Sequence, residues 1–131
     1  MLKLVVCLFF SFIIAQNTVC FEIEPNPYPN NPALGCFSKY INVLDCFDIY
    51  AEGSVQDEKV LHAAAIAAEL LDNDEDGIVD DPALFQILQE EHALMPIFSS
   101  EWSSCLENFE QNPIIYGILR KLKSHKLWDF L

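Results

Sequence analysis

Hydrophobic residues predominate between Tyr40 and Ala51, where isoleucine, valine, phenylalanine and tyrosine are interspersed with the polar residues Asn42, Asp45 and Asp48. Because β-branched and aromatic residues favour strands, this stretch predicts a strand or a short hairpin that turns near Asp45 and Cys46. A helix is the alternative over the same residues. The glycine at position 53 then ends the run.

The next run of the chain has the spacing of a helix. Its apolar residues recur three and four positions apart as far as Leu71, which predicts an amphipathic helix with one apolar stripe. Ser54, followed by Asp57 three residues later, has the arrangement of a capping box, so we expect the helix to begin at Ser54. The stripe consists of Val60, Leu61, Ala64, Ala67, Ala68 and Leu71.

Further elements are predicted after residue 80. Asp81 can cap a helix and Pro82 suits the first helical position, so we expect a second helix that runs to about His92. Leu94–Phe98 predicts a short strand at a sheet edge, since the proline within it cannot donate a ladder hydrogen bond. The stretch Ser99–Gln111 is ambiguous between helix and loop.

A final helix is predicted over residues 113–127. Pro113 opens it, and apolar residues recur within it at helical spacing. These are Ile114, Ile115, Ile118, Leu119 and Leu122, and the basic residues Arg120, Lys121, Lys123 and Lys126 lie beside them.

The first 20 residues have the organisation of a secretory signal peptide. Lys3 precedes an apolar run that starts at Leu4 and ends at Ala15, interrupted once by a serine. A transmembrane helix needs about 20 consecutive apolar residues, so we expect a cleaved signal, no transmembrane anchor and a secreted, extracellular protein. Cleavage after Ala15 and cleavage after Cys20 both fit the small-residue rule.

Residues 21–35 contain a stretch rich in proline and asparagine, which predicts an extended lead-in. The remainder, residues 36–131, has the length of one domain. We therefore expect a single α+β domain, with a helix-loop-helix unit beside a short antiparallel sheet.

Charge is distributed unevenly along this chain. It has 20 acidic and 7 basic residues and a formal net charge of −13, which disfavours nucleic acid as a partner. Four of the 7 basic residues fall between Arg120 and Lys126. This segment can fold back onto the acidic body of the protein, or it can bind an extracellular protein partner or an anionic surface.

Cysteine usage agrees with secretion but leaves the pairing open. Cys36, Cys46 and Cys105 belong to the mature chain under either cleavage, and Cys20 joins them only if cleavage follows Ala15. Four cysteines allow three disulfide connectivities, whereas three leave one thiol over. Their spacing does not match a zinc site.

The most specific motif is the acidic run DNDEDGIVDD from Asp72 to Asp81. Aspartates at alternate positions can turn their oxygens inward around a calcium ion, which takes six to eight oxygen ligands. Gly77 permits the sharp turn that follows, after which a backbone carbonyl can face the ion. The predicted calcium ligands are Asp72, Asp74, Asp76, the carbonyl of Ile78, Asp80 and Asp81.

These ten residues resemble an EF-hand loop and, in the pattern DxDxDGxxDD, the calcium loops of thrombospondin type 3 repeats. In an EF-hand the twelfth loop position carries a bidentate glutamate, but here that position is Ala83. The resemblance implies a structural ion bound weakly, on the order of 10⁻⁴ to 10⁻³ M. An acidic surface turn without an ion is the alternative interpretation, and a solitary loop of this kind could also pair across a homodimer.

Enzyme motifs are absent from the sequence. There is no HExxH, no GxSxG and no phosphate-binding glycine loop. A hydrolase would have to use His62 or His92 with glutamates such as Glu69, Glu90 or Glu91. We therefore predict a secreted calcium-binding protein, with an interaction module acting through residues 113–127 as the first alternative and a hydrolase, or a shortened form of one, as the second.

Overall fold

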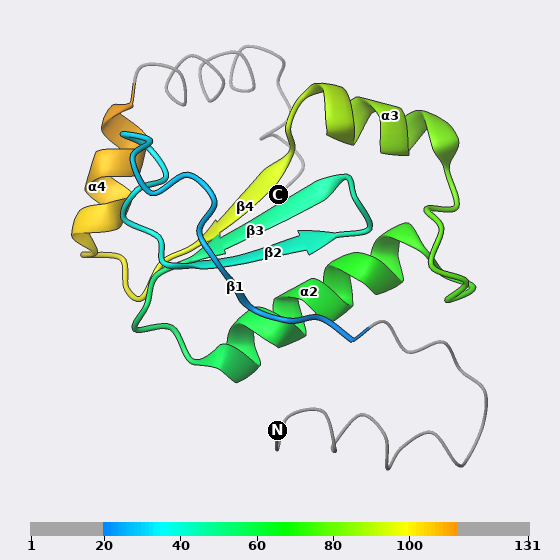
Figure 1. Cartoon of the computed structure of the whole chain (residues 1–131), viewed down its shortest axis with the longest axis horizontal. Coiled ribbons are helices and arrows are strands. Elements are labelled where there is room, and N and C mark those ends of the chain that lie inside the picture. The colour runs from blue at the N-terminus through cyan, green and yellow to red at the C-terminus, as the bar shows by residue number, and fades with distance from the viewer. Residues whose placement is uncertain (1–19, 113–131) are drawn as a thin grey trace.

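A computed structural model describes residues 20–112, so the predicted C-terminal helix and all of the predicted signal peptide except Cys20 lie outside the described residues. Helices and strands are mixed, which confirms the α+β class (Figure 1). In chain order the elements are β1 (Glu24–Pro25), β2 (Lys39–Val43), β3 (Phe47–Ala51), α2 (Asp57–Leu71), α3 (Pro82–Glu90), β4 (Leu94–Ile97) and α4 (Ser104–Gln111). Within residues 20–112, no helix is both long and apolar enough to cross a membrane.

The four strands form one mixed sheet in the order β1-β2-β3-β4. The pairs β1–β2 and β2–β3 are antiparallel, but β4 runs parallel to β3, so the sheet is not wholly antiparallel as predicted. Between β3 and β4 the chain passes through α2 and α3 and returns to the end of the sheet from which β3 started. Such a crossover is what parallel neighbours require. Strand β4 lies at an edge, as its proline predicted.

Strands β2 and β3 form the predicted hairpin, which rules out the alternative of a helix. Val43 pairs with Phe47, and the Cys46 N–H donates to the Val43 carbonyl at 3.2 Å. Leu44 and Asp45 complete the turn with φ values of 50° and 58°. Left-handed conformations at both positions match the twist of the two strands.

Helix α2 packs on one face of the sheet. Its Val60 and Ala64 are fully buried against Ile41, Val43 and Ile49. The helix begins at Asp57 with Gln56 at the N-cap and no side-chain capping bond, so the predicted capping box at Ser54 is wrong. Val55 is buried, and its N–H donates to the Glu52 carbonyl at 3.0 Å. Residues 52–55 therefore form a turn, and the helix begins after them.

The face of the sheet opposite α2 carries an aromatic cluster, which α4 covers. Phe37, Tyr50 and Phe109 are buried together, with Phe98 in ring contact with Phe37 and Phe109. Ser103 caps α4 by accepting the Cys105 N–H at 3.0 Å, so a helix occupies much of the ambiguous stretch 99–111. Cys36 and Cys105 lie at disulfide distance and attach the start of the domain to α4.

The proline- and asparagine-rich lead-in differs from the expected extended segment. It contributes β1 to the sheet edge and then folds into turns. Asn26 is 9% exposed, and its amide donates to the carbonyls of Leu34 at 2.7 Å and Phe37 at 2.8 Å. Because these bonds satisfy buried backbone groups, residues 24–37 form part of the packed domain.

Candidate metal site

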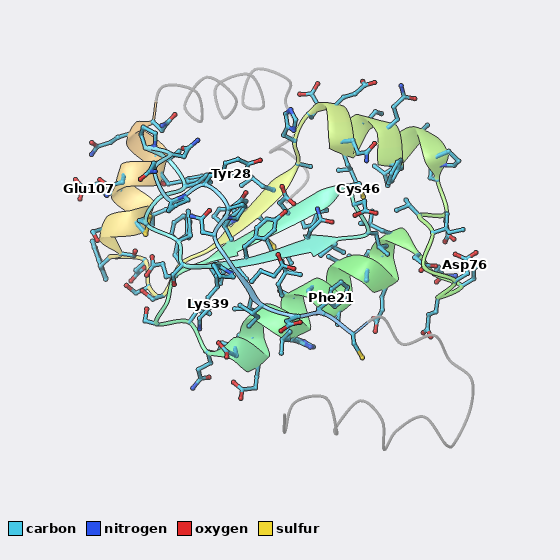
Figure 2. All side chains as sticks on the ribbon, in the orientation of Figure 1. Phe21, Tyr28, Lys39, Cys46, Asp76 and Glu107 are labelled. Atoms are coloured by element: carbon cyan, nitrogen blue, oxygen red, sulfur yellow. A yellow bond between two sulfur atoms is a disulfide. The ribbon has the colours of Figure 1, made fainter. Side chains whose placement is uncertain are left out.

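The acidic loop joins α2 to α3 at the margin of the molecule, where Figure 2 labels Asp76. Its two ends are held together, because the Asp80 N–H donates to the Leu71 carbonyl at 2.9 Å. Val79 is 6% exposed and points inward. Asn73 and Glu75 are exposed. The loop is therefore closed at its base and anchored by one apolar side chain.

Asp72 organises the loop from inside. Although charged, it is only 3% exposed, and its two carboxylate oxygens accept the N–H groups of Asp76 at 3.1 Å and Gly77 at 2.7 Å. Gly77 has a φ of 87°, which a side chain rarely adopts. A Cβ there would meet nothing within 4 Å, so glycine is needed for the backbone conformation and not for space.

Three of the predicted ligands come together in this loop. Asp72, Asp74 and Asp80 each offer one carboxylate oxygen, and these oxygens all lie within 4.8 Å of one another. Asp80 is oriented by the Asn73 N–H, which donates to its carboxylate at 2.9 Å. Within residues 20–112 this is the one group of three or more histidine, cysteine or acidic side chains with metal-binding geometry.

Electrostatic repulsion accompanies this clustering. The negative charge of Asp76, followed by a side-chain hydrogen bond with Asp72, raises the pKa of Asp74 above its ordinary value. Like charges at short range disfavour the ionised form of a carboxyl group. A bound cation would relieve this repulsion, because its positive charge attracts all of the carboxylates.

The other predicted ligands have different neighbours. The Asp76 carboxylate accepts the Ile78 N–H at 2.8 Å, and it is not a member of the group of three. Asp81 is the N-cap of α3, as predicted, and accepts the N–H groups of Ala83 at 2.9 Å and Leu84 at 3.2 Å. Coordination by the Ile78 carbonyl stays a prediction.

The donor set of the three aspartates is oxygen only, which suits hard cations such as calcium and magnesium. Three carboxylates cover part of the six to eight positions that calcium takes, so backbone carbonyls and water would have to supply the remainder. The arrangement of the three aspartates can hold a metal ion, and it does not by itself select which ion.

The histidines suggested for a hydrolase do not join this group. His62 is exposed on α2, and His92 is exposed just after α3 with a φ of 50°. Neither belongs to a cluster of metal-binding side chains within the described residues. Catalysis by either histidine stays a prediction.

A polar cluster that was not predicted from the sequence lies on the sheet face opposite α2. One oxygen of the Asp48 carboxylate accepts both the Tyr40 hydroxyl and the Asn42 amide at 2.8 Å. Burial, followed by the bond to Asp48, raises the pKa of the Tyr40 hydroxyl. The hairpin register pairs Asn42 with Asp48, so the predicted turn position could have revealed the cluster.

No protein-family model, curated protein or solved structure matches this chain. The three aspartates of the acidic loop are therefore the feature that points to a function.

Proposed function

We propose that this protein binds a calcium ion in the extracellular space, in the loop of residues 72–80, and that the ion stabilises the fold. The observation that carries the proposal is the convergence of Asp72, Asp74 and Asp80, with one oxygen of each within 4.8 Å of the others. Asp72 adds support, because it is 3% exposed and its two carboxylate oxygens accept the N–H groups of Asp76 and Gly77, which holds the loop in shape around this group.

One further feature favours a structural, weakly bound ion over a calcium sensor. Ala83, at the position where an EF-hand carries its bidentate glutamate, lies in the first turn of α3 and offers no carboxylate. Extracellular calcium, at roughly millimolar concentration, can still saturate a site with a dissociation constant of about 10⁻⁴ to 10⁻³ M. The Cys36–Cys105 pair fits the same location, since disulfides persist in oxidising compartments.

The test is calorimetric calcium titration of the mature protein, together with thermal unfolding at each calcium concentration. Asp74→Asn and Asp80→Asn remove charge from the site while keeping an oxygen of similar shape, so Asn73 retains an acceptor at position 80. Glu75→Gln is the matched control, because it removes one exposed charge from the same loop outside the group of three.

We expect saturable binding by the wild type and by Glu75→Gln, with affinity lowered about tenfold or more in the other two variants because each charge-assisted ligand contributes strongly. At calcium concentrations about ten times the dissociation constant, the ion should stabilise the wild type by about 1.4 kcal/mol. Absence of binding, with melting indifferent to calcium, would reduce the loop to an acidic turn. Tighter binding of magnesium than of calcium would contradict the choice of ion.

A further inference from the structure

Helix α3 is incompletely packed within the described part of the chain. It has nine residues and buries none of its side chains. Helices shorter than about 12 to 15 residues are marginal in water unless they pack on something. Leu84 and Ile87, one turn apart on the same face, are 38% and 56% exposed. We call this pair the α3 patch.

Acidic groups border the α3 patch at the C-terminal end of the helix. Glu90 and Glu91 are exposed there, and the last turn carries no basic residue. Two negative side chains at the negative end of a helix dipole are unfavourable and leave this end suited to a cation. An open hollow of about 240 Å³ adjoins the same end, and its lining includes Asp45, Asp48 and His92.

Residues 20–112 supply few cations of their own. They contain 19 acidic residues and two basic ones, Lys39 and Lys59, for a net charge of −17. Lys39 forms an ion pair with Asp57 at 2.7 Å, and Lys59 lies in the first turn of α2, at the end of that helix farthest along the chain from α3. Residues 113–131 hold four basic residues and Asp129, for a net charge of +3.

We propose that the protein's own C-terminal segment, residues 113–131, packs on α3. Its apolar residues, which recur at helical spacing, cover the α3 patch, and its basic side chains lie beside Glu90, Glu91 and the acidic hollow. Charge complementarity of −17 against +3 selects this occupant over other apolar partners.

The chain is long enough for this arrangement. Helices α3 and α4 lie at opposite ends of the sheet, with β4 running between them (Figure 1). Strand β4 has four residues, or about 13 Å. The 19 residues that follow Asn112 can span about 28 Å as a helix and about 60 Å when extended. Both spans exceed the length of β4, so the segment is long enough to pass along the sheet towards α3.

Hydrogen exchange of the backbone amides of α3 tests the proposal on the full mature chain at one fixed calcium concentration. One variant reverses three charges of the segment (Arg120→Glu, Lys121→Glu, Lys123→Glu), and a second removes apolar contact without a charge change (Ile118→Ser, Leu122→Ser). The control is Lys59→Glu, which reverses a basic residue outside the segment. Holding calcium fixed makes the outcome independent of the metal proposal.

We expect exchange in α3 to become about tenfold faster in both segment variants and to stay unchanged in the control, with β2 and β3 unaffected in all three. Unchanged exchange in α3, or equal acceleration in α3 and β3, would overturn the proposal. Protection of α3 that rises with protein concentration, with a dimer in light scattering, would identify a second copy as the occupant. Binding of the wild type to vesicles of phosphatidylcholine and phosphatidylserine, with α3 unprotected in solution, would identify a membrane and overturn the proposal too.

Discussion

Removing the disulfide bond between Cys36 and Cys105 should lower the free energy of unfolding by several kcal/mol. The two cysteines are 69 residues apart, and the loop that they close contains β2, β3, α2, the acidic loop, α3 and β4. Chain-entropy arguments assign a loop of this length roughly 4 kcal/mol of stabilisation. Domains of this size have total stabilities of about 5 to 15 kcal/mol, so the loss would be a large fraction of the whole.

The perturbation is the double variant Cys36→Ala, Cys105→Ala, and the assay is urea unfolding followed by circular dichroism. We expect the free energy of unfolding to fall by about 4 kcal/mol while the native spectrum persists. The spectrum should persist because Phe109 still holds α4 against Phe37 and Phe98 through ring contacts. Cys46, which is buried, stays intact in the variant.

A chemical reductant supplies the control. It should lower the stability of the wild type to that of the double variant and leave the variant itself unchanged. Two results would contradict this prediction: a wild-type unfolding curve that the reductant does not shift, or a loss of less than about 1 kcal/mol in the variant. The free energy of loop closure expected for a separation of 69 residues is larger than that.

Three other changes follow from single interactions. Asp81→Ala should cost about 1 kcal/mol in thermal unfolding, because the N–H groups of Ala83 and Leu84 lose their acceptor. Asn26→Ala should cost about 2 to 4 kcal/mol in urea, because two carbonyls lose their donor. Burial, the largest cause, raises the pKa of Tyr50 from 10.0 to about 12. The stability that the neutral Tyr50 hydroxyl contributes is therefore full below pH 10 and is lost as the pH rises through 12. Ultraviolet titration of tyrosine ionisation measures this pKa.

Local rules predicted the parts of the fold that depend on neighbouring residues. The β2–β3 hairpin follows from the β-branched and aromatic residues between Tyr40 and Ala51, and the start of α3 follows from an aspartate directly before a proline. The same kind of rule failed at Ser54. Burial of Val55 in the core outweighed a capping box, which is worth only about 1 kcal/mol.

The candidate metal site was likewise predicted in part from the sequence. The spacing of the aspartates predicted that Asp72, Asp74 and Asp80 would share one site, and the closed loop brings their carboxylates together. Asp76 was predicted as a ligand from its position alone. In the structure its carboxylate binds the Ile78 N–H two residues later, a local interaction that competes with coordination.

The helical and extended segments and the position of the acidic loop could be predicted from the sequence, because each depends on residues a few positions apart. The fold was needed to show that β4 runs parallel to β3, that Cys36 lies beside Cys105, and that the lead-in packs through Asn26. These arrangements join residues far apart along the chain. Their free energy comes from burying shared surface, and no local pattern of side chains records which surfaces will meet.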